Sequence, residues 1–195
     1  STSTLSAPKV EKFKSGKPIV FYGTSITQGG CASRPGMTYS NILGRWFDCE
    51  AINLGFSGNA RMDRSMLEAI KRIDAQKYVI NCLPNCTQEI IRDSAYHFMS
   101  TLAKERPDVT IYMVENVEFT DRHINQRTAK DLVEKNRMWS DLYKQLRKEG
   151  YKNLRYIPSE GYVGTDDEHS VDGAHFTDLG FMRMAETFKK YLKKR

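Results

Sequence analysis

The feature of this sequence that most constrains the fold is an alternation of short apolar runs with longer stretches of helical periodicity. The runs are rich in β-branched and aromatic residues and lack a regular polar alternation, which is typical of strands buried on both faces. They occupy residues 19–22, 51–54, 78–82, 110–114 and 154–157. Because parallel strands require crossover connections, this pattern predicts an α/β fold, a three-layer α/β/α sandwich around a five-stranded parallel sheet.

The stretches between the runs place apolar residues three and four positions apart, as on one face of a helix. We expect helices over residues 39–47, 62–73, 87–104, 126–149 and 177–194. Thr87 can cap the third helix, which should end before Pro107, and Gly150 ends the fourth.

The length of the chain fits a single domain. With 195 residues, of which 39% are hydrophobic and 28% charged, it can bury one sizeable core but not two. No apolar run is long enough to cross a membrane, and the first residues show no signal-peptide pattern. Residues 1–15 resemble a linker or a trimmed end, so we expect the folded domain to span residues 16–195, with an upstream segment removed.

The formal charge of +6 does not indicate a nucleic-acid partner. Much of the excess lies in Lys189, Lys190, Lys193, Lys194 and Arg195, where cations suit the carboxyl end of a helix. No nucleic-acid motif accompanies them. The four cysteines lack metal-ligand spacing, and Cys82 and Cys86 have no histidine beside them. We therefore expect no metal and no cofactor.

Polar residues follow several of the predicted strands. Ser25 comes directly after the first strand, Gly55 and Asn59 follow the second, and Asn85 follows the third. Since the carboxyl ends of parallel strands share one edge of a sheet, where open α/β sheets bind ligands, these residues should converge. The alternative for Ser25 is that its hydroxyl only caps a helix.

The sequence Asp172-Gly173-Ala174-His175 supplies what a nucleophilic serine needs. A serine hydroxyl requires a base, and a histidine base requires a carboxylate that fixes its tautomer. Alone, this spacing is also compatible with a solvated acid and a surface histidine. His169 is a competing base, although its acidic neighbours, residues 166–168, indicate a solvated loop.

Taken together, these motifs resemble those of the SGNH (GDSL-type) hydrolases. The four blocks of that superfamily appear in order as Gly23-Thr24-Ser25-Ile26-Thr27, Asn53-Leu54-Gly55-Phe56-Ser57-Gly58-Asn59, Leu83-Pro84-Asn85 and Asp172-x-x-His175. The longer run over residues 22–36 is similar to a bacterial branch of the superfamily. The resemblance covers almost the whole chain and implies a flavodoxin-like sheet with strand order 2-1-3-4-5.

The resemblance also implies roles for individual residues. Ser25 would be the nucleophile, His175 the general base and Asp172 the residue that orients it. The backbone N–H groups of Ser25 and Gly55 and the side chain of Asn85 would form the oxyanion hole.

Two positions depart from the family pattern. The family's common Gly-Asp-Ser is Gly-Thr-Ser here, so residue 24 lacks a carboxylate. The third block usually reads Gly-x-Asn-Asp, and this leaves Asn81 as a rival to Asn85. We favour Asn85 because it ends the strand, whereas Asn81 lies within it.

We expect a serine esterase that removes O-acetyl or other short acyl groups from carbohydrate. Arg34, Asn59 and Glu115 are candidate substrate-binding residues, although Glu115 could instead pair with a neighbouring cation. The alternatives are a lysophospholipase or thioesterase acting on a longer acyl chain, and an inactive carbohydrate-binding homologue. The resemblance implies a small-molecule or oligosaccharide ester as partner, a monomer or weak homo-oligomer, and export from a bacterial cell.

Overall fold

A computed structural model describes residues 3, 5–6, 13–117 and 119–193 of the chain. It contains one parallel sheet of five strands in the order β2-β1-β3-β4-β5, which confirms the predicted fold class and strand order. The strands are β1 (Ile19–Gly23), β2 (Ala51–Gly55), β3 (Lys77–Asn81), β4 (Thr110–Val114) and β5 (Leu154–Ile157). Each lies within a residue of the run that predicted it. Most of residues 1–15, the expected linker, fall outside the described residues.

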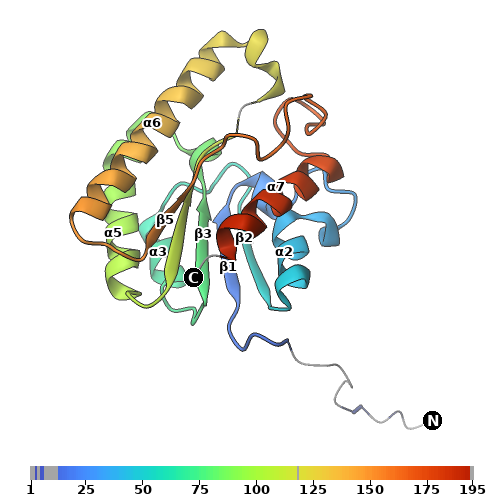
Figure 1. Cartoon of the computed structure of the whole chain (residues 1–195), viewed down its shortest axis with the longest axis vertical. Helices are drawn as coiled ribbons and strands as arrows, with labels where there is room; N and C mark the ends of the chain where they lie inside the picture. Colours follow the sequence, from blue (N-terminus) through green and yellow to red (C-terminus); the bar gives the residue numbers. More distant parts are fainter. Residues whose placement is uncertain (1–2, 4, 7–12, 118, 194–195) are drawn as a thin grey trace.

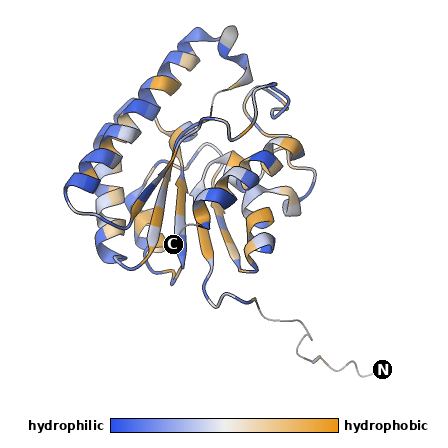
Figure 2. Cartoon of the chain, in the orientation of Figure 1, coloured by the Kyte–Doolittle hydropathy of each residue, from blue (hydrophilic) through white to orange (hydrophobic). Residues whose placement is uncertain are grey.

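Helices cover both faces of the sheet (Figure 1). One face packs against α3 (Arg64–Ile70), α5 (Tyr96–Glu105) and α6 (Gln126–Lys148), and the other against α2 (Tyr39–Phe47) and α7 (Asp178–Leu192). In β1, Val20 and Tyr22 join the first core and Ile19 and Phe21 the second, and all four are at most 1% exposed. Figure 2 shows mostly hydrophobic strands and helices that carry both hydrophobic and hydrophilic residues, with α6 the most hydrophilic.

Two of the expected helices differ from the observed ones. The helix expected over residues 62–73 begins only at Arg64, because Met62 adopts a left-handed backbone (φ 58°) and donates its N–H to the Tyr22 hydroxyl at 3.0 Å. The helix expected over residues 87–104 is three segments, α4 (Gln88–Ile90), a π-helical turn (Ile91–Ala95) and α5. Thr87 does cap its start, accepting the N–H of Ile90.

The remaining helical expectations agree closely with the structure. The bounds of α2 match, α6 ends one residue early, and α7 ends at Leu192. The expected end of α7 at Lys194 lies outside the described residues. Shorter turns are α1 (Ser25–Gln28) and the 3-10 segments η1 (Pro35–Met37), η2 (Leu83–Asn85) and η4 (Thr120–His123). Within the described part of the chain, no helix combines the length and apolarity needed to span a membrane.

The register of the strands brings distant residues to one edge. Gly23 at the end of β1 lies opposite Gly55 of β2 on one side and Asn81 of β3 on the other. The loops that leave these strands therefore begin at the same level. This edge carries the candidate site.

Candidate active site

Ser25 is the first residue of α1, directly after the end of β1. The helix is capped not by Ser25 but by Thr24, whose hydroxyl accepts the N–H of Ile26 at 3.3 Å. Threonine is an effective cap, so the residue that departs from the Gly-Asp-Ser pattern begins the helix. This arrangement leaves the hydroxyl of Ser25 available for another partner, and the capping alternative for Ser25 is wrong.

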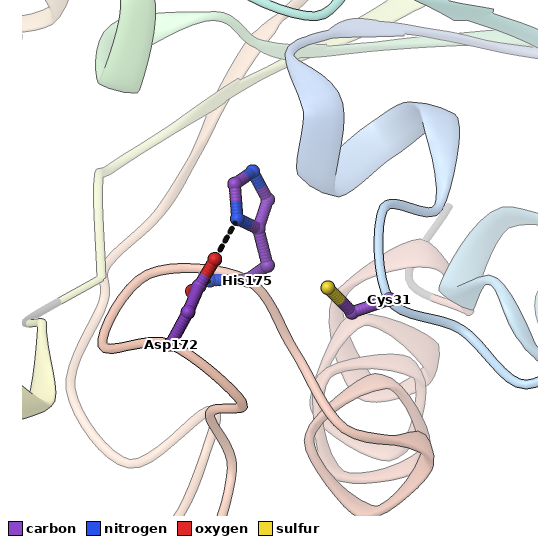
Figure 3. Close-up of side chains that lie close together, drawn as sticks. All are labelled: Cys31, Asp172 and His175. Atoms are coloured by element: carbon purple, nitrogen blue, oxygen red, sulfur yellow. Dashed lines mark hydrogen bonds and ion pairs between the residues drawn. The ribbon is translucent and has the colours of Figure 1, made fainter.

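The turn Asp172–His175 precedes α7 and holds both partner side chains. Asp172 Oδ1 accepts the backbone N–H groups of His175 at 2.7 Å and Ala174 at 3.0 Å, while its Oδ2 lies 2.7 Å from His175 Nδ1 (Figure 3). Gly173 adopts a φ of 97°, a left-handed conformation that suits glycine. The backbone N–H and imidazole of His175 hold the pKa of Asp172 at about 2, below its ordinary value of 3.8. The turn therefore presents an ionised carboxylate to the imidazole.

A chain of hydrogen bonds links Asp172, His175 and Ser25. His175 Nε2 lies 2.8 Å from Ser25 Oγ, although the two residues are 150 positions apart. Since a carboxylate only accepts hydrogen bonds, His175 Nδ1 must carry the proton, and Nε2 then accepts the hydroxyl proton of Ser25. Side chains so arranged can activate a serine as a nucleophile. The structure thus brings together the three residues that the sequence singled out.

A pocket of about 330 Å³ opens over Ser25. Its lining residues come from five separate segments and are Thr24, Ser25, Ile26, Ser57, Gly58, Pro84, Asn85, Phe119, Ala174 and His175. Asn85 Oδ1 accepts the backbone N–H of Ala60 at 3.3 Å, which fixes the side-chain amide and leaves its NH₂ group as a donor. Asn81 is instead 3% exposed, lies within β3 and contacts the Tyr39 hydroxyl. Asn85 is therefore the asparagine of the pocket.

Gly55 is not in this pocket, contrary to the expectation from the sequence. Its N–H donates to Asn53 Oδ1 at 3.0 Å, and any side chain at this position would collide with the backbone of Gln28. The glycine that lines the pocket is Gly58, which has no hydrogen-bond partner for its N–H among the described residues. The Gln28 side chain accepts the N–H of Ser57 at 3.2 Å and so fixes this loop beside α1.

None of the three candidate substrate-binding residues lines the pocket. Arg34 is exposed and lies near Asp178, at the start of α7. Asn59 donates to the Ser57 carbonyl at 3.0 Å and lines a separate hollow beside Tyr22. Each is therefore placed outside the site.

Glu115 has a structural role that differs from both of its predicted ones. Its carboxylate accepts the Tyr156 hydroxyl at 2.6 Å, and the N–H and hydroxyl of Ser159 at 2.8 and 2.9 Å. These contacts tie the end of β4 to the segment after β5.

His169 does not compete with His175 for Ser25. It is 3% exposed and packs edge-on against the Phe176 ring, with centroids 5.7 Å apart. The acidic loop beside it is not merely solvated, because Asp166 pairs with Arg183 and Asp167 with Arg122, each at 2.6 Å.

The sequence reasoning missed several pocket residues. Ser57 and Gly58 lie in the second block that the sequence singled out, but nothing in the pattern shows which N–H groups are already used. Phe119 comes from a loop between β4 and α6 that carries no motif. Its place in the pocket depends entirely on tertiary structure.

Cys31 lies beside the turn that carries His175 and Asp172 (Figure 3). The thiol, a carboxylate oxygen and a ring nitrogen of these three residues lie within 4.8 Å of one another, which is close to the spacing of a metal site. Both ring nitrogens of His175 already have partners, however, in Ser25 and Asp172. A cation bound here would compete with the hydrogen bonds of the serine site.

Comparisons of the sequence and of the structure with known proteins indicate the same family. The sequence model of the GDSL-like Lipase/Acylhydrolase family matches residues 16–193. The chain is similar to a structure described as a GDSL-like lipase from Bacteroides ovatus, with a TM-score of 0.89 and 37% identity, over 95% of this chain and 54% of that one. This chain thus spans about half the length of that protein. No curated protein matches the sequence.

Two more distant structures share the fold. One is a family two carbohydrate esterase from Clostridium thermocellum in complex with cellohexaose (TM-score 0.66, 16% identity, 97% of this chain and 66% of that one). The other is a two-domain esterase active on acetylated mannans, co-crystallised with mannopentaose (TM-score 0.66, 17% identity, 91% and 49%).

Proposed function

The chain belongs to the GDSL-like lipase/acylhydrolase family, and from that premise we propose that it is a serine esterase that forms an acyl-enzyme on Ser25. The observation that carries the proposal is the hydrogen-bonded chain from Ser25 Oγ through His175 to Asp172, with lengths of 2.8 and 2.7 Å. A serine, a neutral imidazole and an ionised carboxylate in this order form the set of groups that acyl transfer requires.

The reaction begins when Ser25 Oγ attacks the ester carbonyl and its proton passes to His175 Nε2. Asp172 keeps the imidazole in the required tautomer and stabilises the imidazolium that forms. His175 then gives the proton to the departing alcohol as the tetrahedral intermediate collapses. Water activated by the same imidazole hydrolyses the acyl-enzyme and restores the serine.

The oxyanion of the tetrahedral intermediate needs hydrogen-bond donors beside Ser25. We assign this role to the backbone N–H groups of Ser25 and Gly58 and to the side-chain NH₂ of Asn85, since these three residues line the pocket. Donors fixed in advance toward the developing charge contribute roughly 3 kcal/mol each to transition-state stabilisation. Gly58 takes the place that the sequence reasoning gave to Gly55.

The pocket favours a short acyl group. Its volume of about 330 Å³ is modest, and its lining combines polar residues such as Asn85 and His175 with the apolar residues Ile26, Pro84 and Phe119. A long acyl chain would need an extended apolar tunnel, and the lining residues described here do not form one. We therefore propose O-acetyl groups on carbohydrate as the substrate, and the activity of the two-domain esterase of the same fold on acetylated mannans supports this choice. Because polymeric carbohydrate does not enter cells, we also propose that the protein is exported from a bacterium.

Hydrolysis of 4-nitrophenyl esters tests this proposal. The acetate, butyrate and octanoate should be compared in the wild type and in Ser25→Ala. We expect highest kcat/KM on acetate and no turnover above background in Ser25→Ala. A preference for octanoate would indicate the lysophospholipase or thioesterase alternative. Equal trace rates in both proteins would indicate a binding protein without catalysis.

A further inference from the structure

A second, larger hollow adjoins the pocket over Ser25. This groove has a volume of about 680 Å³ and shares Pro84 and Asn85 with the catalytic pocket. One wall is the segment from η2 into α4, and the other is the amino-terminal half of α6, which extends past the carboxyl ends of the strands (Figure 1). The groove therefore begins where the scissile ester would sit and leads away from it.

Three residues of the groove, Gln88, Asp131 and Lys135, are held in place by bonds to one another and carry no net charge. Lys135 is 8% exposed and pairs with Asp131 at 2.9 Å, and the same carboxylate accepts the side-chain N–H of Gln88 at 2.9 Å. Gln88 belongs to α4 and the other two residues to α6, so these bonds join the two walls. Their charges cancel, and the polar groups offer hydrogen bonds to hydroxyls.

The remaining charges of the groove are mainly positive. Arg127 and Lys130 lie one turn apart on α6, are exposed, and form no ion pair with any described residue. Glu89 is the remaining carboxylate of the lining, and it contacts its own backbone N–H and the Thr87 hydroxyl at the start of α4. Arg127 also lies near enough to Asp131 to help lower the pKa of that carboxyl, but the Asp131 carboxylate already pairs with Lys135. The exposed cationic groups of Arg127 and Lys130 are therefore available to an anionic ligand.

We propose that this groove binds the alcohol half of the substrate and that this half is an acidic saccharide bearing a carboxylate, as in a uronic acid. The inference rests on the proposed esterase function. The planar guanidinium of Arg127 matches a carboxylate in geometry, and Lys130 adds a second charge beside it. Arg127 and Lys130 are then specificity-determining residues that select acidic over neutral acetylated saccharides.

The experiment compares acetate release from O-acetylated oligogalacturonides and O-acetylated xylo-oligosaccharides. The wild type should prefer the acidic substrate, and salt should weaken that preference because the two cations are exposed. In Arg127→Ala/Lys130→Ala, kcat/KM for the acidic substrate should fall by about 10-fold, mainly through KM, with a smaller change for the neutral one.

The matched control is Lys144→Ala/Lys148→Ala, which removes the same charge from exposed positions of the same helix outside the groove. It should retain the preference of the wild type. Equal activity of the wild type on both substrates, or an equal loss on both in Arg127→Ala/Lys130→Ala, would overturn the inference.

Calorimetric binding of deacetylated oligogalacturonide separates this inference from the proposed function. We expect Ser25→Ala to bind this ligand and Ser25→Ala/Arg127→Ala/Lys130→Ala to bind it at least about 10-fold more weakly. If the two variants show this difference in binding but the wild type cleaves no ester, the groove binds acidic saccharide and the proposed esterase function is wrong. If the wild type hydrolyses esters but the two variants bind the saccharide equally well, the esterase function stands and the proposed role of the groove is wrong.

Discussion

Two histidines lie six residues apart in the loop between β5 and α7, and their surroundings differ sharply. His175 is at the mouth of the pocket, between the hydroxyl of Ser25 and the carboxylate of Asp172. His169 is buried against Phe176, and its backbone carbonyl accepts the N–H of Thr177 just before α7. One histidine can exchange protons with a substrate, whereas the other helps to hold the loop on the domain.

The difference shows that an acidic neighbourhood does not by itself identify a catalytic histidine. Both histidines have aspartates close in sequence, but Asp166 and Asp167 are paired with arginines. Asp172 instead uses one oxygen to fix the turn and the other to hold the imidazole. What distinguishes His175 is a second partner, Ser25, supplied from the opposite end of the chain.

The largest expected effect is that of replacing His175. In His175→Gln, the base for Ser25 is lost, and we expect kcat for 4-nitrophenyl acetate to fall by about 1000-fold or more. The thermal midpoint should change little, because the side chain is partly exposed. Activity within 10-fold of the wild type would refute the role assigned to this residue.

Asp172→Asn should have the next largest effect. The amide oxygen can still accept the backbone N–H groups of the turn, but its NH₂ would face His175 Nδ1 and favour the wrong tautomer. We expect kcat to fall by roughly 100- to 10,000-fold. The measurement is the rate of 4-nitrophenyl acetate hydrolysis, with circular dichroism to show that the variant is folded. A folded variant that keeps full activity would show that the imidazole needs no carboxylate.

His169→Gln should give the opposite result to His175→Gln. Removal of a buried ring that packs on Phe176 should lower the free energy of unfolding by about 1–3 kcal/mol. The kcat should stay within about 3-fold of the wild type, since the side chain is outside the pocket. Urea denaturation together with the nitrophenyl acetate assay checks both parts. Loss of activity without loss of stability would mean that the contrast between the histidines is wrong.

The smallest effect concerns pH. Since the pKa of Asp172 is lowered in the folded state from 3.8 to about 2, its carboxylate stabilises the fold above about pH 4, and this contribution is lost as the pH falls toward 2. The contribution is modest because the side chain is 48% exposed. Urea denaturation between pH 2 and 6 should therefore show a slightly steeper acid loss of stability in the wild type than in Asp172→Asn.

The same pKa has a consequence for activity. Asp172 stays ionised throughout the neutral range, so its own protonation should not contribute to the pH profile of kcat/KM above about pH 4. A step in kcat/KM between about pH 5 and pH 8 that disappears in Asp172→Asn would contradict this expectation.

The strands and their order could be predicted because buried parallel strands leave a strong local signature. No charged residue interrupts the apolar run of β1, Ile19–Gly23. The observed bounds of α2 agree with the predicted ones because Thr38 caps the start of this helix. The start of α3 could not be predicted, since it depends on a hydrogen bond from Met62 to Tyr22, forty residues earlier. The π-helical turn after α4 likewise has no marker in the sequence.

In the candidate site, too, some residues could be predicted from the sequence and others could not. Ser25, Asp172 and His175 could be found because their chemistry restricts the residue types and the family resemblance orders them. The choice between Gly55 and Gly58 required knowledge of the Asn53 side chain, which already uses the N–H of Gly55. Glu115 could not be interpreted because its hydrogen-bond donors, Tyr156 and Ser159, lie more than forty residues away.

The most direct test of the account is covalent labelling by a fluorophosphonate, read by peptide mass spectrometry. The wild type, His169→Gln and His175→Gln should be compared at equal concentration. We predict a single labelled residue, Ser25, with similar rates in the wild type and His169→Gln and a rate at least about 100-fold lower in His175→Gln. Labelling at another residue, or an undiminished rate in His175→Gln, would contradict the claim that His175 activates Ser25.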